Sequence, residues 1–480
     1  MDLRSFIALL EREGELVRVA AEVDPHLEMA EIADRASKAR GPALLFERAK
    51  RPAGAAGPAV PVLMNQLGSY RRLELALGAP LEDLAARIAG LVDLQVPAGL
   101  IGKVRALGQL RELASFTPTL VKKAAWRDVV VDPPDLGRLP VLTTWPGDGG
   151  PFITLPIVVT KDGRGRRNAG MYRLQVFDER STGMHWHLHH DGAANYRAAG
   201  DRMEVAVALG TDPAVTYAAT APLPPGIDEF MFAGFLRGEP VELAKCATVD
   251  LEVPASAEIV LEGYVEKGDV RREGPFGDHT GYYSLADDYP VFHVTAMSHR
   301  RDAIYPATIV GRPPMEDAYI GKATERLFLP LLRLVQPEIV DMDLPIEGVF
   351  HDCAIVSIKK EYPGQARKVM SAIWGMGQMM FTKFVVVVDE HVDVHDYSEV
   401  AWRVFNNVDP ARDCVVVAGP LDVLDHSSPL ARYGAKMGID ATKTWPDEGH
   451  QREWPEELAM DPAVKARVTA RWAELGLPFT

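Results

Sequence analysis

Residues 151–179 read PFITLPIVVTKDGRGRRNAGMYRLQVFDE, and this stretch decides the fold. It contains three short apolar runs, at 152–155, 157–160 and 174–177, with turn residues at 163–165 between the second and the third. Short strands at this spacing, separated by glycine and proline, predict an antiparallel barrel or sandwich. Runs of the same kind recur at 129–131, 205–208, 258–264 and 289–296. We therefore expect a β domain over 125–310.

The segments on either side have a different periodicity. Residues 2–13 have the apolar spacing of a helix, with Asp2 as its N-cap, and begin a mixed α/β region that ends near residue 124. After the β domain, 316–335 is predicted to be a helix within a connecting segment. Strand-like and helical runs then alternate up to the C-terminus, with helices at 363–374 and 397–407, which is typical of an α/β domain.

Length, charge and cysteine content limit the possible functions. The 480 residues correspond to about three domains at roughly 150 residues per domain. Lys and Arg total 52 and Asp and Glu total 67, so the net charge of −15 argues against a nucleic-acid partner and against stable attachment to anionic lipid. Three separated cysteines and the absence of a signal-like N-terminus or a long apolar run indicate a soluble, cytoplasmic protein.

A histidine-rich segment is the first candidate for chemistry. Four of the 13 histidines lie between positions 185 and 190. If this segment were a strand, His185, His187 and His189 would share one face. Imidazoles in this arrangement bind a metal, a phosphate or a flavin, or they form a solvated strand edge without a function. The local pattern leaves both interpretations open.

The second candidate is EGPFGDHTGYY at 273–283, where Glu273 and Asp278 flank a Gly-Pro-Phe-Gly turn. Two carboxylates near an arginine form a recurring acid–base device. One carboxylate stays ionised against the guanidinium, while burial raises the pKa of the other so that it can donate a proton. The alternative is that both residues only cap a turn.

The sequence contains no phosphate-binding loop, dinucleotide fingerprint or nucleophile elbow. It does contain a series of motifs that together resemble the UbiD family of decarboxylases. The motifs are Asn-x-Gly-Met-Tyr-Arg at 168–173, LEVPASAEIVLEG at 251–263, EGPFGDHTGYY at 273–283, GRPP at 311–314, TKF at 382–384, DPARD at 409–413, KMGIDAT at 436–442 and QREW at 451–454.

The resemblance implies an α+β multidomain fold. It consists of an N-terminal α/β domain at 1–124, a central split β-barrel like that of flavin reductases at 125–310, a linker helix at 311–340 and a C-terminal α/β dimerisation domain at 341–480. This division agrees with the change in periodicity along the chain.

The resemblance also implies a cofactor site. The expected cofactors are prenylated FMN, a divalent metal (Mn²⁺ or Mg²⁺) and a monovalent cation such as K⁺. The implied metal ligands are Asn168, His189 and Glu229, a set with oxygen and nitrogen donors that suits manganese or magnesium. The implied cofactor contacts are Met171, Tyr172, Arg173, His185, Trp186, His187, His190, Asp191 and Lys383.

The implied catalytic residues are Arg173, Glu273 and Asp278. By the resemblance, Arg173 orients the substrate carboxylate, Asp278 supplies the proton that replaces CO₂, and Glu273 holds Arg173. We therefore expect non-oxidative decarboxylation of an aromatic acid in ubiquinone or menaquinone biosynthesis. The alternatives are a catabolic or detoxifying decarboxylase of phenolic or heteroaromatic acids and a non-catalytic flavin-binding protein.

The same resemblance gives the expected partners. They are a prenylated-FMN synthase as the cofactor supplier and further copies of the chain, in a homodimer or a dimer-based hexamer. A lipophilic substrate would require transient contact with a membrane, although the sequence shows no basic amphipathic anchor.

Overall fold

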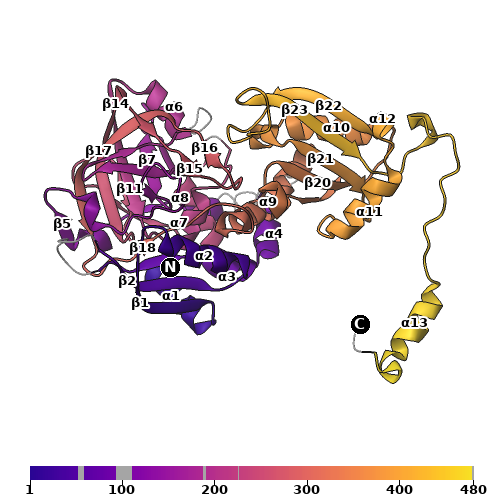
Figure 1. Ribbon diagram of the computed structural model, residues 1–480, viewed down its shortest axis with the longest axis horizontal. Helices are drawn as coiled ribbons and strands as arrows, with labels where there is room; N and C mark the ends of the chain where they lie inside the picture. The colour runs from indigo at the N-terminus through magenta and orange to yellow at the C-terminus, as the bar shows by residue number, and fades with distance from the viewer. Residues whose placement is uncertain (52–58, 93–110, 187–190, 225, 478–480) are drawn as a thin grey trace.

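A curled antiparallel sheet forms the centre of the molecule, with the N-terminal elements below it and the C-terminal domain to its right in Figure 1. The computed structural model describes residues 1–51, 59–92, 111–186, 191–224 and 226–477. Within these residues the sheet has nine strands in the order β6-β9-β10-β17-β14-β11-β7-β8, with β5 paired to β17. The strands are β5 Val129–Val131, β6 Phe152–Ile153, β7 Ile157–Lys161, β8 Arg167–Met171, β9 Leu174–Asp178, β10 Ser181–Gly183, β11 Arg202–Leu209, β14 Ile259–Glu273 and β17 Asp287–His299.

Both faces of this sheet are buried, because neighbouring residues of β7 enter different apolar cores. Ile157 and Val159 pack in one core with Phe230, whereas Val158 packs in the other with Phe46. A strand that meets water on neither face carries apolar residues at successive positions. This explains why the sequence of β7 shows an unbroken apolar run.

Short helices and strands surround the central sheet. The helices are α6 Asp191–Ala198, α7 Pro213–Ala218 and α8 Glu229–Arg237. Asp228 caps α8, since its side chain accepts hydrogen bonds from the backbone amides of Phe230 and Met231. The additional strands are β4 Thr119–Leu120, β12 Glu242–Lys245 and β13 Glu252–Pro254, and the hairpin β15 Phe276–Gly277 with β16 Tyr283–Ser284.

The N-terminal region forms a second sheet in the order β1-β2-β3-β18. Its strands are β1 Leu16–Val23, β2 Ala43–Ala49, β3 Val62–Met64 and β18 Tyr305–Pro306, and its helices are α1 Leu3–Arg12, α2 Glu28–Lys38, α3 Tyr70–Leu77 and α4 Leu81–Val92. As predicted, Asp2 caps α1 by accepting a hydrogen bond from the amide of Ser5. Because β18 follows the central sheet in the chain, this pairing joins the two regions.

Helix α9, Glu316–Val335, leads into the C-terminal domain. The sheet of this domain has the order β19-β20-β21-β23-β22. Its strands are β19 Ile339–Asp343, β20 Cys353–Ile358, β21 Phe384–Asp389, β22 Cys414–Pro420 and β23 Tyr433–Asp440, and its helices are α10 Gln365–Trp374, α11 Tyr397–Asn407 and the short α12 Pro410–Asp413. Helix α10 packs with Ala354 and Val356, and α11 packs with Ile355, so the two helices cover opposite faces of β20.

After β23 the chain runs away from the C-terminal domain towards α13, Pro462–Ala470, which has no buried residue (Figure 1). No helix in the described part of the chain is long and apolar enough to span a membrane. The elements match the predicted α+β multidomain fold.

The strand arrangement considered for the histidine-rich segment does not apply to His185. Strand β10 ends at Gly183, before the histidine-rich segment, so strand alternation does not orient His185. The backbone turns instead, because the amide of Trp186 donates a hydrogen bond to the carbonyl of Met184. His187, His189 and His190 lie outside the described residues.

Candidate active site

Arg173, in the short link between β8 and β9, is the centre of a network of ion pairs and hydrogen bonds. Its Nε donates to Glu273 Oε1 at 3.1 Å, one terminal nitrogen donates to Asp278 Oδ2 at 2.6 Å, and the other donates to the hydroxyl of Ser284 at 3.2 Å. The guanidinium also lies over the ring of Phe276, 4.4 Å from its centroid. The structure therefore brings together the three residues expected to be catalytic.

Glu273 ends the long strand β14 and is 1% exposed. Its Oε1 also lies 2.7 Å from Nδ1 of His185, whose ring packs on Tyr289. Burial, followed by the positive charge of Arg173, lowers the pKa of His185. A neutral His185 that donates from Nδ1 thus helps Arg173 to fix the position of the Glu273 carboxylate.

Asp278 lies at the end of the β15 segment and is 5% exposed. Gly277 allows this placement, because a Cβ atom there would lie 2.1 Å from the indole of Trp145. Besides Arg173, the carboxylate of Asp278 accepts hydrogen bonds at 2.8 Å from the backbone amide and from Nδ1 of His279.

These contacts correct the expectation that the proton-donating carboxyl has a raised pKa. Burial acts to raise the pKa of Asp278, but the hydrogen bond and charge of His279, together with Arg173, hold it well below its usual range. Asp278 is therefore ionised in this state. Burial opposes the charge on His279, yet the hydrogen bond and charge of Asp278 raise the pKa of that imidazole to about 9.

Two of the three expected metal ligands lie together. Glu229 is the first residue of α8, and its carboxylate accepts hydrogen bonds from Asn168 Nδ2 at 3.0 Å and from the amide of Ala169 at 3.1 Å. Burial raises the pKa of Glu229 to about 7. Glu229 forms no ion pair with another described residue, so a bound cation would supply the positive charge that balances this carboxylate. The oxygen donors of this pair fit a hard divalent metal.

Two of the expected cofactor contacts, Tyr172 and Trp186, form an aromatic pair beside these ligands. The ring of Tyr172 meets Trp186 edge to face at a centroid distance of 6.4 Å, and its hydroxyl donates to Asn168 Oδ1 at 3.3 Å. The Trp186 Nε1 atom is buried and has no hydrogen-bond acceptor among the described residues. Met171 lies at the end of β8, and Asp191 at the start of α6. Two aromatic rings beside a buried N–H donor without an acceptor among the described residues fit a planar, heteroatom-bearing ring system.

Lys383 lies in the C-terminal domain, just before β21. Its Nζ contacts Asp425 Oδ1 at 3.2 Å and the hydroxyl of Ser427. This loop also reaches the central domain, where His426 packs on Tyr282 at a centroid distance of 3.9 Å. Lys383 therefore braces a loop that contacts the segment bearing Asp278, and its contact with a cofactor stays a prediction.

A cavity of about 210 Å³ opens beside Asp278. Its lining combines the central domain with the segment before α9: Trp145, Gly277, Asp278, Gly281, Tyr282, Tyr283, Gly311 and Arg312. The carboxylate of Asp278 therefore has access to a space in which a small molecule can lie.

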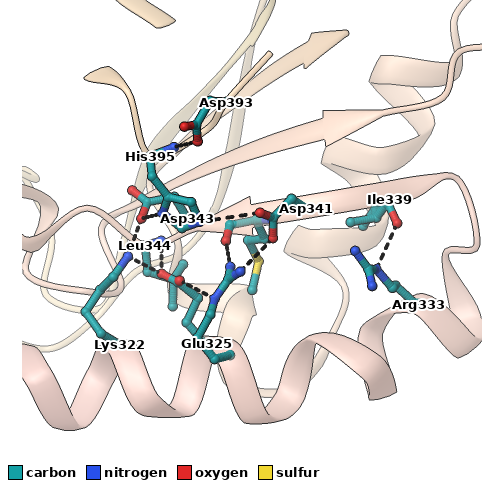
Figure 2. Close-up of polar contacts among 11 residues, drawn as sticks. Lys322, Glu325, Arg333, Ile339, Asp341, Asp343, Leu344, Asp393 and His395 are labelled. Carbon is teal, nitrogen blue, oxygen red and sulfur yellow. Dashed lines mark hydrogen bonds and ion pairs between the residues drawn. The ribbon is translucent and has the colours of Figure 1, made fainter. Parts of the chain in front are cut away.

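A second charged network lies where α9 meets the C-terminal sheet (Figure 2). Lys322 bonds to both Glu325 and Asp343, and His395 Nδ1 lies 2.9 Å from Asp343 Oδ1. The carboxylates of Glu325 and Asp343 lie close enough to His395 to share a metal ion. However, the ammonium group of Lys322 already contacts both carboxylates and supplies the positive charge there. We therefore interpret this network as ion pairs that hold α9 against the C-terminal sheet and not as a metal site.

Three residues extend the Arg173 network beyond the predicted set. His279 and Asp317 lie next to Asp278, and His351 comes from the C-terminal domain. Burial raises the pKa of Asp317 to about 7, against the effect of the nearby His279. The only sequence signal was the position of His279 directly after Asp278, since the contact with His351 spans 72 positions.

Comparison with known proteins gives a consistent family match. Three domain models of 3-octaprenyl-4-hydroxybenzoate carboxy-lyase (UbiD) match the chain in order. The N-terminal model matches residues 7–92, the Rift-related central model matches 119–313, and the C-terminal model matches 318–441.

Several relatives match nearly the whole chain. An uncharacterized protein of Archaeoglobus fulgidus is 54% identical, covering 99% of this chain and 98% of its own. The closed form of vanillic acid decarboxylase from Sedimentibacter hydroxybenzoicus superimposes with a TM-score of 0.85 at 28% identity, covering 98% of each chain. The UbiD-class enzyme HmfF from Pelotomaculum thermopropionicum, in complex with FMN, superimposes with a TM-score of 0.81 at 33% identity, covering 98% of this chain and 100% of its own. An evolved dimeric form of HmfF has been solved with prenylated FMN.

Proposed function

We propose that the Arg173 site decarboxylates an aromatic acid with prenylated FMN as the cofactor. This chain belongs to the UbiD family of carboxy-lyases, which supports the proposal. The observation that carries the proposal is the buried triad in which one guanidinium contacts both Glu273 and Asp278. A protein that only bound flavin would not require this proton-donor arrangement.

Arg173 orients the substrate carboxylate in this proposal. Of the three hydrogen bonds of Arg173, the one to the neutral hydroxyl of Ser284 is the weakest, so an incoming carboxylate can replace it at the smallest cost in binding energy. A guanidinium binds a carboxylate more strongly than a neutral hydroxyl, because both partners carry charge. Glu273 keeps the guanidinium in place during this exchange, and His185 in turn holds Glu273.

Asp278 delivers the proton that replaces CO₂. Its side chain borders the cavity and contacts Arg173, so it lies beside the place where Arg173 would hold the substrate. The substrate carboxylate adds a negative charge near Asp278, which raises the proton affinity of the Asp278 carboxylate. Substrate binding thus prepares Asp278 to carry a proton.

Asn168, Glu229 and His189 would hold a manganese or magnesium ion, and a K⁺ ion would accompany it. Met171, Tyr172, His185, Trp186, His187, His190 and Asp191, with Lys383 from the C-terminal domain, would surround the flavin. When bound, prenylated FMN supplies an electron sink for the bond to CO₂. The partly buried carboxylate of Glu229 and the aromatic pair of Tyr172 and Trp186 support this assignment.

For the substrate we propose an aromatic acid of ubiquinone or menaquinone biosynthesis, such as a 4-hydroxy-3-polyprenylbenzoate or a dihydroxynaphthoate. The family models describe a 3-octaprenyl-4-hydroxybenzoate carboxy-lyase, which supports this choice. A catabolic decarboxylase of phenolic acids is the second candidate, because vanillic acid decarboxylase superimposes over the whole chain. A prenylated-FMN synthase would supply the cofactor in either case, and we place both reactions in the cytoplasm.

The test is reconstitution followed by a substrate screen. Protein co-expressed with a prenylated-FMN synthase should contain a metal, absorb in the near-UV and visible range, and release CO₂ from at least one hydroxybenzoate, polyprenylated benzoate or naphthoate. The variant Glu229→Gln should bind less metal, whereas Glu252→Gln, a partly buried glutamate paired with Lys161, should not. A colourless wild-type protein without metal would contradict the cofactor assignment.

A further inference from the structure

Apolar side chains are exposed at the mouth of the cavity beside Asp278. Tyr282 and Tyr283 line this cavity, yet both side chains are exposed to solvent. Leu285, two positions after Tyr283, is 91% exposed. These residues lie in or next to the β15–β16 hairpin, on the side of the central domain that faces the C-terminal domain (Figure 1). The lining of the cavity therefore continues outward as apolar surface.

A loop of the C-terminal domain, residues 421–433, lies against the same part of the central domain. The ring of His426 packs on Tyr282 at a centroid distance of 3.9 Å. Near the other end of the loop, Arg432 lies close to Tyr289 at the start of β17. Burial raises the pKa of Tyr289 to about 12, and the positive charge of Arg432 opposes this shift. The loop therefore faces both the hairpin and the first residues of β17.

This loop exposes two further apolar side chains. Leu430 is 60% exposed, and Tyr433 is also exposed. The amide of Tyr433 donates a hydrogen bond to the carbonyl of Leu430 at 3.4 Å, so the two residues are held close together. Single exposed leucines and tyrosines are ordinary, but a group of them beside one cavity marks a binding surface. We call this group the apolar rim; it consists of Tyr282, Tyr283, Leu285, Leu430 and Tyr433.

The size of the cavity limits which part of a substrate it can enclose. Its volume is about 210 Å³. Because a protein cavity of about 150 Å³ holds a benzene ring, this space suits one aromatic ring with its carboxylate and small substituents. A longer substituent has to leave through the mouth, where it meets the apolar rim.

We propose that the apolar rim binds a polyprenyl chain carried by the substrate, while the carboxylated ring of that substrate lies in the cavity beside Asp278. The inference rests on the proposed decarboxylase function, and it selects the prenylated acids among the candidate substrates. The rim residues position the substrate and do not touch the bond that breaks. Because the rim is built from two domains, a bound chain bridges them.

The chemistry of the rim fits such a chain. Contact with leucine and aromatic side chains removes apolar surface from water, and every isoprene unit adds five carbon atoms to that surface. A tyrosine presents an apolar ring while its hydroxyl stays hydrogen-bonded, so tyrosines suit a surface that is wet before the ligand binds. The hydroxyl of Tyr283 accepts a hydrogen bond of 2.9 Å from the amide of Gly147, which fixes its ring at the mouth.

The test measures CO₂ release by the holoenzyme from 4-hydroxybenzoates that carry a geranyl or a farnesyl chain at position 3. For the wild type, kcat/KM should rise about five-fold or more from the geranyl to the farnesyl acid, since one more isoprene unit is removed from water. Leu430→Glu and Leu285→Glu place a charge on the rim. Each should reduce this gain to less than about two-fold, mainly through a higher KM for the farnesyl acid.

Leu120→Glu is the matched control, because Leu120 is 63% exposed and lies on β4, outside the rim. This variant should keep the gain of the wild type. A wild type without a gain, a gain that survives in both rim variants, or an equal loss in Leu120→Glu would overturn the proposal. Conversion of Leu430→Glu from dimer to monomer with an intact gain would assign Leu430 to a subunit contact and would also overturn it.

A second measurement does not depend on turnover. A 3-geranyl-4-hydroxybenzoate with a diazirine at the end of its chain should, on irradiation of the holoenzyme, label peptides that contain residues 282–285 or 430–433. An excess of the farnesyl acid should prevent this labelling. Labelling confined to other peptides, or labelling that the farnesyl acid does not prevent, would overturn the rim. A wild-type holoenzyme that releases CO₂ from no acid would contradict the proposed function instead, and the labelled positions would still decide on the rim.

Discussion

Asp278 carries the first prediction at the residue scale. Its carboxylate contacts Arg173 and His279 and borders the cavity. Asp278→Asn keeps the shape of the side chain and one of its two acceptor oxygens, but it removes the carboxyl group that can carry the transferred proton. We expect this variant to keep its flavin absorbance and to lose decarboxylation by about 100-fold or more, together with exchange of the product hydrogen in D₂O. Wild-type turnover in this variant would remove Asp278 from the donor role.

At single residues, contacts were easier to predict from the sequence than protonation states. The contacts of Arg173 with Glu273 and Asp278 were anticipated only by the resemblance to the UbiD family, because the spacing of the two carboxylates alone is equally compatible with residues that cap a turn. The ionisation state of Asp278 could not be anticipated, because it depends on the contact of His279 with that carboxylate. Charge balance in a buried site depends on every neighbour within a few ångströms, and these neighbours come from distant parts of the chain.

The junction of α9 with the C-terminal sheet is the main joint at the element scale (Figure 2). Lys322 and Arg326 of α9 face Glu325, Asp341 and Asp343, and His395 completes the set from the loop before α11. If His395 is charged, three positive groups balance three carboxylates. Removing one charge from this buried network leaves another charge uncompensated, so the protonation state of His395 affects the stability of the fold.

This balance predicts a pH dependence of stability. Hydrogen bonds with Asp341 and Asp343 raise the pKa of His395 from 6.5 to about 9 in the folded protein. The stabilisation from its charge is therefore complete below pH 6.5 and is lost as the pH rises to about 9. In urea unfolding, the wild type should lose more stability between pH 6.5 and 9.5 than His395→Asn, which has no titrating group at this position. Parallel pH curves would contradict this prediction. His279 is present in both proteins, so its titration cancels in the comparison.

Local sequence signals were sufficient to predict the ends of some helices but not the ends of the longest strand. Helices α9 and α11 were predicted with the bounds that the structure has, because both have a clear apolar period and α11 has Asp396 as its N-cap. Strand β14 extends beyond its prediction as far as Glu273. The sequence Lys267-Gly268-Asp269 resembles a turn, but Gly268, with φ of +85°, lies in a bulge that lets the strand continue. The pairing with β17 stabilises this polar extension, and that contact is non-local.

At the scale of the whole molecule, the C-terminal domain exposes several large apolar side chains to solvent. Trp402 and Phe405 protrude from α11, and Val416 and Val417 protrude from β22, an edge strand of the described sheet. Large apolar side chains that are exposed on a helix and on an edge strand are candidates for contacts between subunits. This exposure supports the proposed role of residues 341–480 in dimerisation. The sequence could suggest that role only by resemblance, because surface exposure requires the folded domain.

The last prediction tests this interface. Phe405 is 82% exposed, so its side chain contributes little to the stability of a single chain. Phe405→Glu should therefore leave the thermal midpoint within about 2 °C of wild type. If the C-terminal domain forms the dimer, a buried carboxylate at the interface should shift the mass measured by light scattering from dimer towards monomer. Val130→Glu provides the control, because Val130 is 69% exposed on β5 of the central domain and should not alter the mass. A dimer that tolerates Phe405→Glu but dissociates with Val130→Glu would move the interface to the central domain. In that case the apolar edge of the C-terminal domain would need a different partner.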